Sequence, residues 1–73
     1  MKTIFDYSRL RGKIKEKCDT QESFTRQMGM SRTSLSKRLN NQIDFSQDEI
    51  LRACKILDID DSGITQYFFA EKV

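Results

Sequence analysis

The chain of 73 residues is short enough for one small domain, and such a domain needs nearly all its apolar residues for a single core. It has no histidine, and its two cysteines, Cys18 and Cys54, are far apart in sequence, so neither a zinc-finger ligand set nor a Cys/His catalytic pair can be assembled; we expect no enzyme activity, no metal and no cofactor. The net charge of +2 hides a basic and an acidic half: residues 1–43 have ten Lys/Arg and four Asp/Glu, whereas residues 44–73 have three Lys/Arg and seven Asp/Glu. This asymmetry indicates a polyanion as partner of the basic half and a basic protein as partner of the acidic half, or else two ordinary solvated surfaces.

Apolar residues spaced three and four apart, without proline or a useful alternating pattern, predict helices throughout, and we expect five. The first predicted helix begins after Asp6, a good N-cap residue, and runs to about Lys17. Its inward face consists of Tyr7, Leu10 and Ile14. Gly12 lies inside this helix at a cost of about 1 kcal/mol relative to alanine, which indicates a weak middle or a close packing contact.

The second predicted helix follows Thr20, whose hydroxyl can accept a hydrogen bond from a first-turn amide, and covers residues 21–28. Phe24 and Met28 point inward, and Gly29 ends the helix in the position that favours positive φ.

The third predicted helix is capped by Ser31 and extends from residue 32 to about residue 40. Its natural inward residues are Leu35 and Leu39 alone, so the core leaves most of its circumference free. The free faces carry hydroxyls and positive charge. Such a helix can enter the major groove of B-form DNA, which is about 12 Å wide and offers hydrogen-bond acceptors on the base edges.

The fourth predicted helix opens with SQDE, residues 46–49, a capping box in which serine and glutamate satisfy free amides reciprocally. Its inward face consists of Ile50, Cys54 and Leu57. A last short helix begins near Ser62 and presents Ile64, Tyr67 and Phe68. Because these small apolar faces can close a core only by packing on one another, the predicted fold is all-α, a single five-helix domain over residues 1–73.

The stop at Gly29 and the restart at Ser31 are typical of two helices that cross at about 90–120° through a short turn, with Met30 in the core. The stretch TQESFTRQMGMSRTSLSKRLNN, residues 20–41, resembles the helix-turn-helix of the phage repressor and Cro family. The positions that match the family motif are Gln21, Phe24, Met28, Gly29, Met30 and Leu35.

The segments FDYSRLRGKIKEK, SLSKRLNN followed by IDFSQDEI, and YFF are similar to small Cro-like regulators of temperate phages of Gram-positive bacteria. This resemblance covers essentially the whole chain and implies a helix-turn-helix at 20–41 with its recognition helix at 32–40. Two positions depart from the family pattern. Thr25 stands where the motif usually has alanine, and Arg38 stands where it usually has an apolar residue.

Carried over by position, the resemblance implies base contacts from Arg32, Thr33 and Lys37, supported by Ser34 and Ser36. It implies phosphate contacts from Gln21, Arg38, Asn40 and Asn41. Arg32 is the predicted main specificity residue, because a bidentate arginine–guanine pair supplies about 1–3 kcal/mol of discrimination. The alternative is that these residues form an ordinary solvated polar face.

A second candidate surface, for a protein partner, consists of Asp48, Asp58, Asp60, Asp61, Tyr67 and Phe69. The segment DIDDSG, residues 58–63, begins like a calcium loop, but its twelfth position is Phe69 instead of glutamate, so helix capping and surface charge explain its acids more simply. Adjacent aromatics on a short helix cannot all face inward, which makes Tyr67 or Phe69 a candidate exposed anchor.

Two functions follow as hypotheses. In the first, the chain regulates the lysis–lysogeny switch of a phage by occupying double-stranded operator DNA, as a homodimer because one short helix reads few base pairs. In the second, it is an antirepressor that binds mainly the DNA-binding domain of the phage repressor through its acidic half. No apolar run approaches the about 20 residues of a membrane span, and MKTIFDYSRLR lacks the apolar stretch of a signal peptide, so we expect no membrane, no small-molecule substrate and a cytoplasmic location in the bacterial host.

Overall fold

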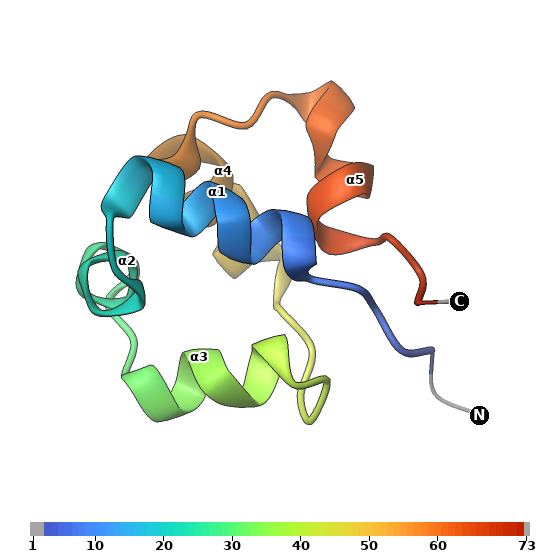
Figure 1. Ribbon diagram of the computed structural model, residues 1–73, viewed down its shortest axis with the longest axis horizontal. Helices are drawn as coiled ribbons and strands as arrows, with labels where there is room; N and C mark the ends of the chain where they lie inside the picture. The colour runs from blue at the N-terminus through green and yellow to red at the C-terminus, as the bar shows by residue number, and fades with distance from the viewer. Residues whose placement is uncertain (1–2, 73) are drawn as a thin grey trace.

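Five α-helices follow one another in residues 3–72, the part of the chain that the computed structural model describes (Figure 1). They are α1 (Ser8–Cys18), α2 (Gln21–Met28), α3 (Arg32–Leu39), α4 (Gln47–Leu57) and α5 (Ile64–Phe68), with a 3-10 turn, η1 (Asp61–Gly63), before α5. Within these residues the extended backbone is limited to an isolated antiparallel bridge between Phe5 and Glu71. The predicted all-α fold with five helices is confirmed.

The local capping signals act as predicted at three of the helix starts. Thr20 Oγ1 accepts a hydrogen bond from the Ser23 amide at 3.1 Å, and Ser31 Oγ accepts one from the Ser34 amide at 3.1 Å. The capping box at the start of α4 is complete, with its serine and glutamate side chains both bonded to backbone amides. Each cap satisfies amides that have no partner inside the helix.

The predicted start of the first helix was wrong by one residue. The helix begins at Ser8, and the N-cap position belongs to Tyr7, which makes no side-chain capping bond. Asp6 lies one residue further out, where its carboxylate accepts hydrogen bonds from the Ser8 amide at 2.9 Å and the Ser8 hydroxyl at 2.6 Å. These bonds lower the pKa of Asp6, the hydroxyl bond most. Gly12 has open space around it, so the close packing contact considered for this position is also wrong.

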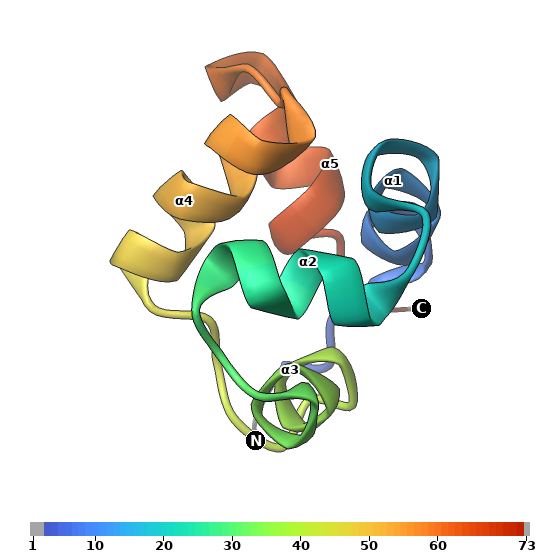
Figure 2. The ribbon, with the colours of Figure 1, turned by 90° about the vertical axis from the view of Figure 1, so that its left-hand side faces the viewer.

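The core forms where the helices meet, and its fully buried side chains come from every α-helix. The largest are Leu10 and Ile14 of α1, Phe24 and Met28 of α2, Leu35 of α3, Leu57 of α4 and Phe68 of α5. In Figures 1 and 2 the views differ by a quarter turn, and both place α3 at the bottom of the molecule, below α2, with α1, α4 and α5 above. The main packing partner of α3 is α2. The third helix is therefore peripheral and presents most of its surface outward.

The two ends of the described chain lie side by side (Figure 1). The Asp6 amide donates to the Ala70 carbonyl at 2.7 Å, and the Lys72 amide donates to the Ile4 carbonyl at 2.8 Å. No helix within residues 3–72 is long and apolar enough to span a bilayer.

Candidate nucleic-acid interface

The turn between α2 and α3 aims the third helix. Gly29 has φ 73° and ψ 31°, the left-handed region, and its amide donates to carbonyls of the last turn of α2. From α4, Arg52 Nη1 donates to the Met28 carbonyl at 2.8 Å and so ties the end of α2 to the rest of the domain. The left-handed residue lets the chain leave α2 and start α3 after a few residues, which glycine does with little strain.

A shallow hollow of about 550 Å³ lies over the outer face of α3. Its lining residues are Gln21 at the start of α2, Arg32, Thr33, Ser36 and Lys37 of α3, and Gln42 after α3. Five of the nine predicted DNA-contacting residues are therefore brought together here, from two helices that are separate in the sequence. Gln42 was missed by the sequence analysis, because it follows the helix and reaches the hollow only through the turn that brings its amide to the Lys37 carbonyl at 2.8 Å.

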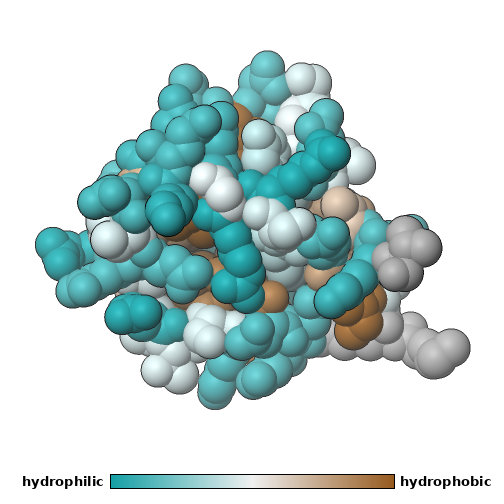
Figure 3. Space-filling view, in the orientation of Figure 1, coloured by the Kyte–Doolittle hydropathy of each residue, from teal (hydrophilic) through white to brown (hydrophobic). Residues whose placement is uncertain are grey.

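The basic side chains of this hollow have no competing partner in the described part of the chain. Arg32 and Lys37 are exposed, and neither takes part in an ion pair or side-chain hydrogen bond within residues 3–72. Figure 3, in the orientation of Figure 1, shows mainly hydrophilic side chains over α1 and α3. Two cationic groups without an internal partner, next to hydroxyls and amides, can bind an anionic, hydrogen-bonding surface such as DNA.

The opposite flank of α3 turns toward α4, and two residues with predicted DNA contacts, Ser34 and Arg38, lie there. Arg38 pairs with Glu49 through two hydrogen bonds of 2.8 Å, and the side chains of this pair are 14% and 17% exposed. Its guanidinium also donates to the Ser34 carbonyl at 2.9 Å. The phosphate contact predicted for Arg38 stays a prediction, and in this structure three of its N–H groups donate to acceptors inside the protein. Ser34 lies one turn before Arg38 and is not among the residues that line the hollow, so its support of base contacts also stays a prediction.

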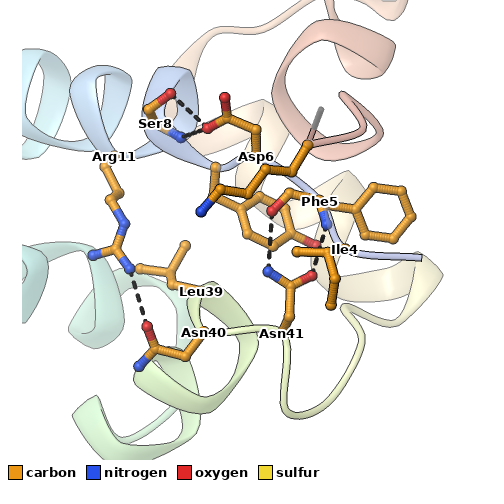
Figure 4. A pocket seen from close by; sticks show the side chains of 10 residues that line it. Ile4, Phe5, Asp6, Ser8, Arg11, Leu39, Asn40 and Asn41 are labelled. Carbon is orange, nitrogen blue, oxygen red and sulfur yellow. Dashed lines mark hydrogen bonds between the residues drawn. The ribbon is translucent and has the colours of Figure 1, made fainter. Parts of the chain in front are cut away.

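Asn41, the other residue with a predicted phosphate contact beside this end of α3, also has hydrogen bonds inside the protein. Its Oδ1 accepts from the Phe5 amide at 2.9 Å, and its Nδ2 donates to the Phe5 carbonyl at 3.0 Å (Figure 4). Asn41 has φ 63°, a conformation that asparagine tolerates better than most residues. The side chain thus imitates a neighbouring strand and fixes the N-terminal segment beside the end of α3.

Asn40 remains exposed, as a phosphate contact requires, and the structure adds a basic neighbour to it. Arg11 Nη2 donates to Asn40 Oδ1 at 3.5 Å, and both residues line a pocket of about 340 Å³ with Lys72 (Figure 4). The sequence offered no signal for Arg11, because its contact joins residues 29 positions apart.

The predicted protein-partner surface divides into two separate places. Phe69, 47% exposed, lines an apolar groove of about 270 Å³ together with Gln47, Ile50 and Leu51 of α4. Asp48 is exposed on the first turn of the same helix. Leu51 is 56% exposed and was missed, although its place between the polar residues of an amphipathic helix is visible in the sequence.

The second place is the hollow beside η1, where Asp58, Asp60 and Tyr67 are joined by Lys13 of α1, with the Lys13 ammonium 6.0 Å from the Tyr67 ring centre. Tyr67 is half-buried there, so Phe69 is the exposed aromatic of the two. Asp61 is exposed nearby, within η1. Asp60 caps η1, accepting from the Ser62 hydroxyl at 2.7 Å and the Gly63 amide at 3.2 Å, and the Ser62 bond is the main cause of its lowered pKa. Among the described residues no group of His, Cys, Asp and Glu side chains is arranged to hold a metal ion.

Comparisons with known proteins connect this chain to a family and to a solved structure. The model of a family described as a protein of unknown function (DUF739) matches residues 3–71. The solution structure of the modulator of repression (MOR) of the temperate bacteriophage TP901-1 from Lactococcus lactis is similar to this chain, with a TM-score of 0.78 and 45% sequence identity over 89% of this chain and 88% of that one. A comparison with curated proteins gave no match.

Proposed function

We propose that this chain, which belongs to the DUF739 family, regulates the lysis–lysogeny switch of a temperate phage by binding operator DNA. Its similarity to a phage modulator of repression supports the proposal, and the sequence resemblance to small phage regulators predicted a role of this kind. In this proposal, the outer face of α3 enters the major groove and the start of α2 lies against the DNA backbone. The protein then acts where phage DNA is present, in the cytoplasm of the bacterial host.

One observation carries the proposal: the hollow that unites Gln21 with Arg32, Thr33, Ser36 and Lys37. These side chains offer donors and acceptors of the kinds that read base edges, with Arg32 at the first position of the helix. The free amides of the first turn of α2 add donors for a phosphate, with Gln21 at their start. Asn40, with Arg11 beside it, supports a further phosphate contact at the other end of α3.

The experiment is a titration of labelled duplexes that tile the switch region of the phage, followed by fluorescence anisotropy. We expect Arg32→Ala to weaken operator binding by about 5- to 150-fold, the equivalent of about 1–3 kcal/mol, and to relax base preference at one position. Lys55→Ala is the matched control, because it removes one exposed positive charge from α4 without touching the hollow. Equal weakening by both variants would contradict a specific role for Arg32.

Salt provides a second test of the same proposal. If the face neutralises about three phosphates, log K should fall with log salt at a slope of about −2.7, which is about 40-fold between 50 and 200 mM. The stoichiometry of the complex on a two-fold symmetric site would measure whether a homodimer binds. An affinity that does not change with salt would count against DNA as the target.

A second candidate function is an antirepressor that binds the phage repressor. Two observations favour it: the similar chain is a modulator of repression, and the apolar groove of Leu51 and Phe69 is exposed beside the acidic Asp48. An exposed aromatic and aliphatic anchor with acidic neighbours suits a basic DNA-binding domain as partner.

Gel shifts with this protein alone, the repressor alone, and both together separate the two functions. Leu51→Lys should abolish an effect on the repressor and leave direct DNA binding unchanged, because Leu51 is outside the α3 hollow. The double variant Asp60→Lys, Asp61→Lys tests the acidic residues at η1 in the same way. If neither variant changes the repressor complex, both versions of this surface are excluded.

A further inference from the structure

The third helix is held by a narrow apolar stripe. Its buried side chains are Leu35 and Leu39, which lie one turn apart on a single line along the helix, and it packs mainly on α2. One line of contact sets how far α3 lies from α2 but limits rotation about the helix axis only weakly. Rotation matters for a reading helix: a turn of about 20° moves groups at its surface, about 5–6 Å from the axis, by about 2 Å, which breaks a hydrogen bond.

The ion pair between Arg38 and Glu49 supplies the missing constraint. Arg38 Nε donates to Glu49 Oε1 and Nη2 donates to Oε2, each at 2.8 Å, which is the bidentate arrangement that fixes both planes. Each end of the pair is itself anchored. Arg38 Nη1 donates to the Ser34 carbonyl within α3, and Glu49 Oε1 accepts from the Ser46 amide at 2.9 Å in the capping box of α4. The pKa of Glu49 is lowered, first of all by Arg38, so the carboxylate stays charged at neutral pH.

Within residues 3–72, the other side-chain hydrogen bonds that join α3 and the residues just after it to the rest of the protein lie at its C-terminal end. Arg11 reaches Asn40 from α1, and Asn41 binds the backbone of Phe5 after the helix has ended. The pair therefore acts on rotation, whereas these bonds act on where the helix stops.

We propose that Arg38 and Glu49 are positioning residues for DNA recognition: their bidentate pair sets the rotation of α3 and so aims Arg32, Thr33, Ser36 and Lys37 at the bases. The inference rests on the proposed DNA-binding function. It gives Arg38 a part in recognition without contact with DNA.

A purely electrostatic effect and the proposed positioning role predict opposite changes in operator affinity for Glu49→Gln. Removing a negative charge from the protein strengthens DNA binding if only long-range electrostatics matter. The positioning role predicts the reverse: Glu49→Gln weakens operator binding by at least about 10-fold, since a displaced α3 loses a charge-assisted hydrogen bond to a base. Asp48→Asn is the matched control, with the same change of charge at the neighbouring, exposed position, and should bind at least as tightly as the natural protein.

The free protein gives an independent readout of helix rotation. Amide residual dipolar couplings of Glu49→Gln and Arg38→Met should fit the natural orientation for α1, α2 and α4 and a rotated orientation for α3, while Arg38→Lys, which keeps the charge but not the bidentate bond, lies between. Unchanged α3 couplings, or operator binding by Glu49→Gln as tight as by Asp48→Asn, would overturn the positioning role. If the natural protein binds no operator, the proposed function fails, and the couplings alone test the role of the ion pair. A rotated α3 in Glu49→Gln then supports the conclusion that the pair sets the rotation of α3, and an unchanged α3 refutes it.

Discussion

Two glycine-to-alanine substitutions, at Gly29 and at Gly12, should change the free energy of unfolding in opposite directions. At Gly29 an added Cβ meets no atom within 4 Å, so the substitution creates no clash, but the residue has φ 73°. A side chain in this left-handed region costs about 1–2 kcal/mol, and the loss of freedom in the unfolded chain returns about 0.4–1 kcal/mol. We therefore expect Gly29→Ala to lower the free energy of unfolding by about 1 kcal/mol.

Gly12→Ala is the matched control. This glycine also has no atom within 4 Å of an added Cβ, but it lies inside α1 and is not among the positive-φ residues. Alanine in a helix interior is favoured over glycine by about 0.5–1 kcal/mol, so this variant should be more stable than the natural protein. The two variants should differ by about 1.5–2 kcal/mol although the chemical change is identical.

Urea unfolding followed by circular dichroism measures both free energies. In thermal unfolding, 1 kcal/mol corresponds to a shift of about 4–8 °C for a domain of this size. The reasoning fails if both substitutions shift the midpoint in the same direction, because the sign is predicted from backbone conformation alone. Operator binding by Gly29→Ala, measured where it is folded, would then report how far the turn alone aims α3.

Three other predictions concern side chains. Asn41→Gly should be more stable than Asn41→Ala by about 1 kcal/mol in urea unfolding, because both lose the bonds to Phe5 but only glycine suits φ 63° without strain; the usual order, alanine above glycine, would contradict the left-handed conformation. Because the Arg38 bond lowers the pKa of Glu49 from its ordinary 4.5, the stability that Glu49 contributes is present above that value and is lost as pH falls through the lower folded value, so the advantage of the natural protein over Glu49→Gln should shrink between pH 7 and pH 3. Urea midpoints at the two pH values check this, and an advantage of constant size would count against the ion pair. Phe24→Ala removes a fully buried ring and should lower the free energy of unfolding by about 3–5 kcal/mol, a large part of the stability of a small domain. Thermal unfolding measures this, and a melting temperature equal to that of the natural protein would show that Phe24 is not a core residue.

The helix boundaries were predictable because their signals are local. The caps of Thr20, Ser31 and Ser46 each join groups three residues apart, and the stop at Gly29 depends on one residue's preference. The error at the start of α1 arose because an aspartate can bond the same amide from one position further out. Other boundaries also differ from the predicted ones by one or two residues, with α3 ending at Leu39 and α5 beginning at Ile64 after η1. Part of the outer face of α3 was predictable for a related reason: once Leu35 and Leu39 face inward, helical geometry places Thr33 and Lys37 on the opposite side. Arg32 lies on the same side as Leu35, three residues before it, and is exposed at the first position of the helix.

The roles of Arg38 and Asn41 could not be predicted in this way. Both are polar, both lie at or beside the reading helix, and both match positions where phosphate contacts were expected. Their partners, Glu49 and Phe5, are 11 and 36 residues away, and nothing in either segment alone indicates that they meet. The predicted protein-partner surface was drawn as one group because the sequence does not show which of its residues lie close together. In the structure, Phe69 lines the groove on α4, whereas Asp60 lines the separate hollow beside η1.

The sequence by itself therefore determined the five helices, the turn at Gly29 and the direction of the basic face of α3, because capping, backbone preference and helical periodicity act within a few residues. Only the tertiary structure decided which polar side chains remain available to a partner. A guanidinium or carboxamide binds whichever acceptor or donor packing brings within about 3 Å, and that neighbour is set by the way the helices close around the core.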